Sequence, residues 1–204
     1  MILLERYAEA VAEELGIEVQ VYGFDSATGL PAPVDYRDLP YHWKAGFYKM
    51  DEDLLRSRLR TAKLVLGDVE NTSKTFFDEF NPGPIGAVLY DLDFYSSTRP
   101  ALDMFRSEGR FRLPRVFCYF DDIVGEMELH SDFTGVRLAI AEFNAGSGIK
   151  LSPAYHLTTS EDIKRWHHQI YILHDFQHSD YNTFVGQENS QLALRAEIIG
   201  DQTH

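Results

Sequence analysis

The stretch IGAVLYDLDFY, from Ile85 to Tyr95, decides the fold of this chain. Its first six residues, Ile85 to Tyr90, form an uninterrupted apolar run, which is typical of a strand buried inside a parallel sheet. Asp91 follows this run directly. Ligands of open α/β folds bind beyond the carboxyl ends of the strands. The stretch therefore predicts a buried strand that presents a carboxylate where a ligand would bind.

Three other runs in the chain have the same form, an apolar segment that stops at an acid. Glu18–Phe24 is followed by Asp25, Lys63–Leu66 by Gly67-Asp68, and Val116–Phe120 by Asp121-Asp122. Helical patterns separate the runs, so we expect right-handed crossovers and a mainly parallel sheet. Parallel strands end at one edge of their sheet, and the acids are therefore predicted to line one rim.

The remaining elements complete a single domain over residues 1–204. Helices are expected at Leu3–Leu15, Glu52–Leu59 with Asp51 as its cap, Thr72–Phe80, after Ser96 or Ser97 with Pro100 in the first turn, and at Val136–Asn144. The last two strands, near Leu151–Leu157 and Gln169–Leu173, are expected to pair antiparallel. The fold class is α/β, a doubly wound, Rossmann-like sheet. Residues 26–50 form a long loop, and loops of that length are often lids or binding segments.

Asp91, Asp121 and Asp122 are the candidate ligands of a divalent metal ion. Mg²⁺ prefers carboxylate and water oxygens, often with few protein ligands. Adjacent strand ends lie about 5 Å apart, so carboxylates from two neighbouring strands can share one ion. The alternative interpretation is that Asp93 caps the next helix and that Asp121-Asp122 opens a turn.

Composition narrows the classes of partner. The formal net charge of −13 disfavours nucleic acid, because phosphates repel an acidic surface. No apolar run is long enough to cross a membrane, and the start of the chain lacks a signal-peptide pattern. Cys118 is the single cysteine, so an internal disulfide is impossible and a cytoplasmic location is expected. The polar segment from Ser179 onward is compatible with an arm that contacts a second copy of the chain in a homo-oligomer.

The motifs in this order resemble a known family. They are Val21–Ser26, Gly29-Leu30-Pro31, Trp43 with Gly46-Phe47, Leu66-Gly67-Asp68, Asp91–Thr98 and Asp121-Asp122. The chain is similar, from about residue 17 to residue 145, to the macrocin-O-methyltransferase-type group of class I methyltransferases. That resemblance implies an S-adenosylmethionine-dependent enzyme that methylates a hydroxyl of a small molecule or sugar with the help of Mg²⁺ or a similar cation.

The resemblance also implies roles for individual residues. Asp25 would hold the ribose hydroxyls of S-adenosylmethionine with Ser26 beside it, and Asp68 would lie near the adenine. Three aspartates would hold the metal, and Asp93 would be the catalytic general base. The metal ligands in this scheme are Asp91, Asp121 and Asp122.

The chain departs from the family pattern at its beginning. Class I methyltransferases begin with a strand and a glycine-rich turn, whereas this sequence begins with the helical pattern Leu3–Leu15. The first strand and its turn are therefore expected to be missing, which would make the domain incomplete at its N-terminal side. Because that strand is central in such sheets, its neighbours are predicted to have unpaired backbone groups on one edge.

Three other functions remain open at this point. A metal-dependent glycosyltransferase also uses an Asp-x-Asp motif, but it requires neither the acids after the earlier strands nor the Asp-Ser…Gly-Leu-Pro segment. A haloacid-dehalogenase-type phosphatase places Asp-x-Asp after its first strand, whereas here two strands precede Asp91. The third alternative is a non-catalytic remnant that keeps the sheet but does not bind the cofactor.

Overall fold

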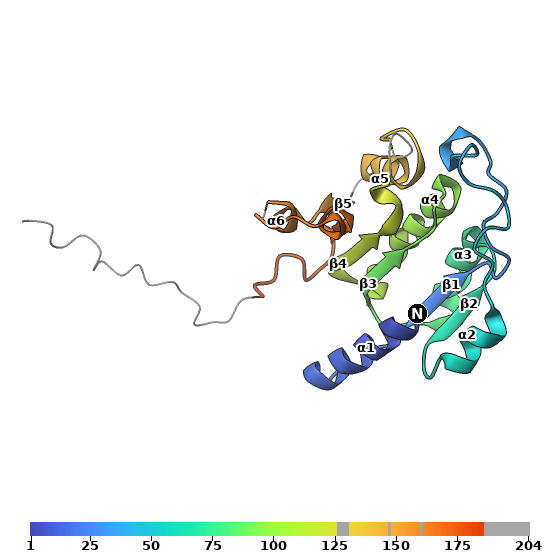
Figure 1. The fold of residues 1–204 in the computed structure, drawn as a ribbon. Coiled ribbons are helices and arrows are strands. Elements are labelled where there is room, and N and C mark those ends of the chain that lie inside the picture. The colour runs from blue at the N-terminus through green and yellow to red at the C-terminus, as the bar shows by residue number, and fades with distance from the viewer. Residues whose placement is uncertain (126–130, 147, 160, 186–204) are drawn as a thin grey trace, which may run out of the picture.

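A computed structural model describes residues 1–125, 131–146, 148–159 and 161–185 as alternating helices and strands (Figure 1). The helices are α1 (Ile2–Leu15), α2 (Glu52–Arg58), α3 (Val69–Phe80), α4 (Tyr95–Asp103), α5 (Gly135–Ala145) and α6 (Tyr155–Thr158). The strands are β1 (Tyr22–Asp25), β2 (Lys63–Leu66), β3 (Ile85–Tyr90), β4 (Arg112–Phe120), β5 (Ile149–Pro153) and β6 (Ile170–Asp175). Three of the 3₁₀ turns concern the site: η1 (Tyr36–Asp38), η4 (Asp121–Ile123) and η6 (Arg165–Gln169).

The strands form two sheets. β1 pairs with β2 in parallel, and the second sheet has the order β3-β4-β6-β5. Within it β3 and β4 are parallel, whereas β6 runs antiparallel to both β4 and β5. The expected fold class is confirmed, with parallel pairs among the first four strands and an antiparallel pair at the C-terminal side.

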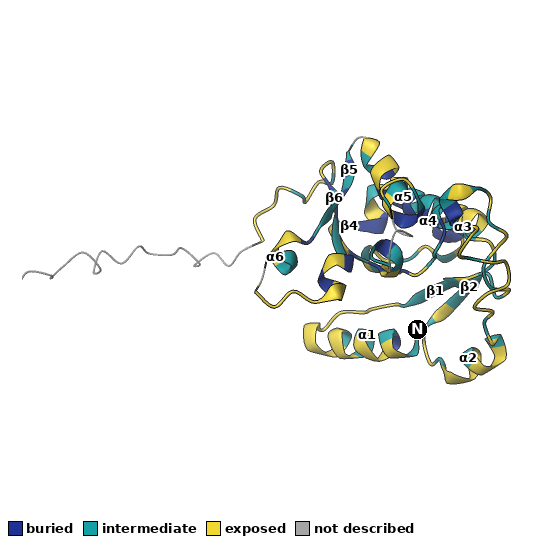
Figure 2. Ribbon diagram, turned by 45° about the horizontal axis from the view of Figure 1, so that its top comes forward, coloured by how far each residue is buried: buried dark blue, intermediate teal, exposed yellow. Residues whose placement is uncertain are grey.

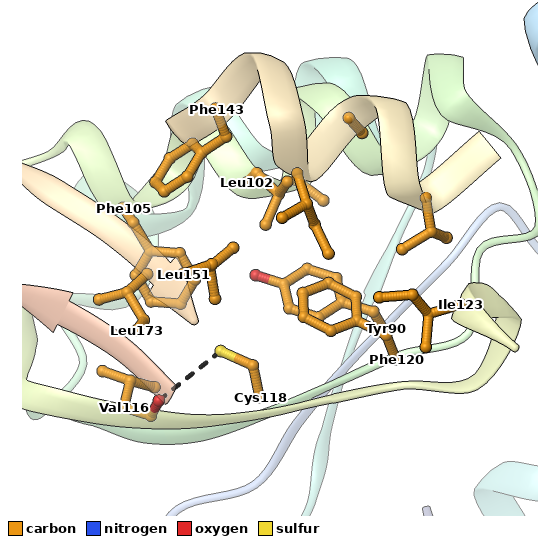
Figure 3. Close-up of a cluster of buried hydrophobic side chains, with 14 of the residues drawn as sticks. Tyr90, Leu102, Phe105, Val116, Cys118, Phe120, Ile123, Phe143, Leu151 and Leu173 are labelled. Carbon is orange, nitrogen blue, oxygen red and sulfur yellow. Dashed lines mark hydrogen bonds between the residues drawn. The ribbon is translucent and has the colours of Figure 1, made fainter. Parts of the chain in front are cut away.

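The core lies between the four-stranded sheet and one layer of helices (Figures 2 and 3). α4 and α5 pack on this face of the sheet, and their apolar side chains meet those of the strands. The labelled members of the cluster in Figure 3 are Tyr90, Leu102, Phe105, Val116, Cys118, Phe120, Ile123, Phe143, Leu151 and Leu173. Burial of this apolar surface fixes β3 and β4 side by side.

The parallel strands β1 and β3 each pair on one side only among the strands that the structure describes. Among the described residues, β1 pairs with a strand only on its β2 side, and β3 only on its β4 side. Incomplete pairing, as expected from the sequence, is therefore present among the described strands.

Several element boundaries agree with the sequence patterns and others do not. β2 and β3 have the expected bounds, and Asp51 caps α2 by accepting a hydrogen bond from the Leu54 amide (2.9 Å). β1 is shorter than the expected Glu18–Phe24 segment. The expected strand at 151–157 is wrong in its second half, because the chain turns into α6 after Pro153. Alternation of apolar residues thus predicts where a strand is, but not how much of it pairs.

Glu5 connects α1 to the segment before β2. Its side chain is only 2% exposed and accepts hydrogen bonds from the amides of Arg60 (2.9 Å), Thr61 and Ala62 (2.7 Å). These backbone donors lower the pKa of Glu5 from 4.5 to about 2, because they stabilise the charged carboxylate. The negative charge of Glu5 therefore stabilises the docking of α1.

None of the described helices combines the length and apolar character needed to cross a bilayer.

We expect the Glu5 contact to make stability depend on pH. The pKa is lower in the folded protein, so the contribution is present above pH 4.5 and is lost as the pH falls toward 2. Glu5→Gln should reduce the free energy of unfolding at neutral pH and flatten its fall below pH 4.5. Urea unfolding at several pH values tests this, with the exposed Glu13→Gln as the control. Equal pH profiles for Glu5→Gln and the unchanged protein would contradict the assignment.

Candidate active site

Asp91, Asp121 and Asp122 lie together at the carboxyl ends of β3 and β4. Tyr90 is the register partner of Phe120 in this parallel pair, so the residues that follow them emerge next to each other. One carboxylate oxygen from each aspartate lies within 4.8 Å of the other two. Asp91 and Asp121 are exposed, and Asp122 is half-buried. The structure thus brings together the three residues that the sequence predicts as metal ligands.

Asp93 is held against this cluster by an unusual backbone conformation. Its φ of 55° lies in the left-handed region, which non-glycine residues seldom adopt and aspartate tolerates better than most. Its amide donates a hydrogen bond to Asp122 Oδ2 (2.9 Å), and the next residue, Phe94, is fully buried. The turn after β3 therefore places Asp93 beside the cluster. The alternative role of Asp93 as a helix cap is not seen, because α4 has no side-chain cap of its own.

Burial and the neighbouring carboxylates raise the pKa values of Asp91 and Asp93. Burial raises the pKa of Asp93 to about 8, with further contributions from Asp122, Asp91 and Asp121. Burial also raises the pKa of Asp91, and the charges of Asp122, Asp121 and Asp25 add to this effect. Like charges at this spacing are unfavourable unless a cation or hydrogen-bond donors compensate them. Three carboxylates also form the donor set that hard divalent cations prefer, so the cluster fits such an ion.

The predicted cofactor residues lie at the ends of β1 and β2. Asp25 is exposed, and its Oδ1 accepts a hydrogen bond from the Ala27 amide (2.6 Å). The Ser26 hydroxyl donates to the Gly29 carbonyl (2.8 Å), so it is used within the loop. Asp68 is exposed and caps α3 by accepting from the Glu70 amide (2.8 Å). The charge of Asp25 acts on Asp91, which places the first sheet's acid within electrostatic reach of the cluster.

The loop over residues 26–50 is closed on itself near its base. The Leu30 amide donates to the Phe47 carbonyl, and the Gly46 amide donates to the Leu30 carbonyl, each at 2.8 Å. Gly29 has a φ of 87°, and a Cβ there would lie 2.4 Å from the Phe47 carbonyl oxygen. Only glycine allows this close approach. The shape of the loop therefore explains the glycine of the Gly-Leu-Pro motif.

Asp38 anchors the middle of the loop to the helix that follows Asp93. Its side chain is 1% exposed, Oδ2 accepts from the Val34 amide (2.9 Å), and Oδ1 accepts from the Ser96 amide (2.8 Å). Asp38 thereby caps α4 from a distant part of the chain. The expectation that Ser96 or Ser97 caps this helix is wrong, since α4 begins at Tyr95 and Pro100 lies inside it rather than in its first turn.

Asp121 has two further neighbours that the sequence did not indicate. The Tyr119 hydroxyl donates to Asp121 Oδ1 (2.7 Å). The side-chain nitrogen of Gln169, Nε2, donates to the main-chain carbonyl of Asp121 (2.7 Å). Burial raises the pKa of Tyr119 to about 12, so its hydroxyl remains a donor at neutral pH. Gln169 belongs to η6 and is 5% exposed. No sequence motif marks either residue.

The comparisons with known proteins concern the fold. No protein-family model and no curated protein matches the sequence. The structure is similar to the crystal structure of the calicheamicin methyltransferase CalS11, with a TM-score of 0.55 and 18% identity over 84% of this chain. The chain therefore shares the Rossmann-like α/β fold of that methyltransferase. It spans 66% of the length of that methyltransferase.

We expect removal of the Asp38 carboxylate to loosen the loop. Asp38→Ala leaves the Val34 and Ser96 amides without this acceptor, and an unsatisfied buried donor costs about 1–3 kcal/mol. Hydrogen exchange of the loop and of the first turn of α4 should become faster. The exposed Asp53→Ala serves as the control. Unchanged exchange at both places in Asp38→Ala would show that the anchor has no effect on loop order.

Proposed function

We propose that this chain is an S-adenosylmethionine-dependent, divalent-metal-assisted O-methyltransferase that acts on a hydroxyl of a small molecule or sugar. The observation that carries the proposal is the convergence of Asp91, Asp121 and Asp122, with oxygens within 4.8 Å, at a strand rim of a methyltransferase fold. Asp93 lies beside this cluster, and Asp25 is within electrostatic reach of it.

In this proposal the cofactor lies at the ends of β1 and β2. The Asp25 carboxylate accepts two hydrogen bonds from the vicinal ribose hydroxyls, which suits its exposed position at the rim. Asp68, at the end of the adjacent strand, lies on the adenine side, with Ser26 shaping the turn between Asp25 and the loop. The support is the placement of these residues on neighbouring strand ends.

The metal is held by Asp91, Asp121 and Asp122 in this proposal, and Mg²⁺ is the cation that best suits this donor set. A bound divalent cation would orient an acceptor hydroxyl and lower its pKa. Burial, together with the neighbouring carboxylates, raises the pKa of Asp91 and Asp93, and this supports a cation at this position because a positive charge offsets the repulsion among the carboxylates.

Asp93 is the proposed general base. In its ionised form, the Asp93 carboxylate would take the proton of the acceptor hydroxyl as that oxygen attacks. When bound, S-adenosylmethionine would supply the methyl group, with the oxygen–carbon bond forming as the carbon–sulfur bond breaks, and the products would be a methyl ether and S-adenosylhomocysteine. Alignment of the oxygen, the methyl carbon and the sulfur supplies much of the acceleration. The rigid turn around Asp93 supports this role, since it fixes the base beside the cluster.

The methyltransferase fold favours this function over a glycosyltransferase or a phosphatase. One observation favours the third alternative, a sheet that no longer binds cofactor. Among the described residues, β1 and β3 each pair with a strand on one side only. The two strands that end at Asp25 and Asp91 are therefore held by fewer main-chain hydrogen bonds than strands inside a continuous sheet. A direct measurement of cofactor binding decides between the two.

We expect S-adenosylhomocysteine to bind this chain saturably in a calorimetric titration, with Mg²⁺ present and with the metal chelated. Asp25→Ala should weaken binding at least tenfold, because a hydrogen bond to a charged group contributes about 1.5–3 kcal/mol. The exposed Asp53→Ala, on α2, serves as the control. A folded protein that does not bind S-adenosylhomocysteine would contradict the proposal and favour the non-catalytic alternative.

A second prediction concerns the metal alone. Mg²⁺ or Mn²⁺ should raise the thermal midpoint, because a ligand that binds only the folded state adds about 2.7 kcal/mol at a hundred times its Kd. Asp91→Asn should remove most of this gain, whereas Asp53→Asn should not. The thermal midpoint is measured with and without cation by scanning calorimetry. Equal cation effects on the protein and on Asp91→Asn would place the ion elsewhere.

A further inference from the structure

We propose that Gln169 and Tyr119 are positioning residues that fix the orientation of Asp121 at the cation site. The inference rests on the proposed function, in which Asp121 is a metal ligand. Neither residue belongs to the acidic cluster, and both act on it through hydrogen bonds.

The antiparallel pairing of β4 with β6 brings Gln169 to the rim. Tyr119 is the register partner of Ile170, so the residue before Ile170 lies opposite the end of β4. Gln169 Nε2 donates to the Asp121 carbonyl at 2.7 Å and approaches Oδ1 at 3.4 Å. One buried amide group therefore contacts both the main chain and the side chain of Asp121.

Tyr119 acts on Asp121 from the strand itself. Its hydroxyl donates to Oδ1 at 2.7 Å, a short distance that is typical of a hydroxyl bonded to a carboxylate. Oδ1 thus lies near two donors, whereas Asp122 accepts the Asp93 amide through Oδ2. With Oδ1 held in this way, the carboxylate plane of Asp121 is fixed before any cation binds.

Fixed ligands bind a cation more tightly than mobile ones. Outer-shell partners of metal ligands typically contribute 10–100-fold to metal affinity. Asp121 is exposed, so its side chain has little packing to restrain it apart from these donors. The C-terminal segment η6 therefore contributes to the site through Gln169, although it carries no ligand in the proposed set.

The test measures Mn²⁺ affinity by electron paramagnetic resonance, together with the thermal midpoint in the absence of metal. Gln169→Leu and Tyr119→Phe each remove a donor and keep most of the side-chain volume. We expect each variant to weaken Mn²⁺ binding about tenfold or more. Tyr119 is partly exposed, so we expect Tyr119→Phe to fold. If Gln169→Leu does not fold, the Mn²⁺ affinity of Tyr119→Phe alone tests the inference.

Two matched controls change the same residue types away from the acids. Gln20→Leu alters an exposed glutamine that contacts Thr61, and Tyr7→Phe alters an exposed tyrosine on α1. Both should leave Mn²⁺ affinity unchanged. A merely structural role would lower the metal-free thermal midpoint without changing the affinity of the folded protein, and that result would overturn the inference.

The outcomes also separate this inference from the proposed function. Tight Mn²⁺ binding that neither Gln169→Leu nor Tyr119→Phe weakens overturns the positioning role and leaves the metal site in place. Absence of Mn²⁺ binding by the unchanged protein overturns the metal site and the positioning role together. Weaker binding in both variants with unchanged controls supports the inference.

Discussion

The parallel pairing of β3 with β4 is the constraint on which the proposed site depends. The register that sets Tyr90 opposite Phe120 makes both strands stop at the same level, so Asp91 and the Asp121-Asp122 pair have to emerge side by side. Repulsion among these carboxylates opposes that arrangement, and it adds to burial in raising the pKa values of Asp91 and Asp93. Apolar burial between the strands and the helices α4 and α5 stabilises the pairing against this repulsion. The core therefore holds together charges that would separate in an open chain.

The sequence predicts the elements whose signal is local. β3 is an apolar run bounded by Gly83-Pro84 and Asp91, and β2 is bounded in the same way by Gly67, so both have the expected ends. The convergence of Asp91, Asp121 and Asp122 could also be predicted, because parallel strands that end in acids bring those acids to one rim. Membership of this acidic cluster follows from chain order and strand direction alone, without any knowledge of loops.

The parts that could not be predicted depend on contacts between distant residues. Ser96 and Ser97 have the local signature of a helix cap, yet Asp38 takes that role across a separation that sequence patterns do not encode. Asp38 offers a carboxylate acceptor that is buried against the helix. Gln169 is similar, since its contact with Asp121 follows from the register of an antiparallel pair. Such registers depend on side-chain packing across strands and not on the composition of either strand.

Methyl transfer places a demand on the relation between the two sheets. In the proposed function the cofactor is held by the end of β1, whereas the acceptor and its base are held by the ends of β3 and β4. Reacting groups have to be aligned to within about 0.5 Å, so the two sheets need a fixed separation. α3 provides part of this connection, because Phe77 stacks on Phe111 just before β4, and its neighbour Phe76 packs against Tyr22 of β1. The loop provides another part, because it follows Asp25 directly and Asp38 anchors it to the first turn of α4 through the Ser96 amide. In the proposed function, the relative position of the reacting groups therefore depends on α3 and Asp38 as well as on the acidic residues themselves.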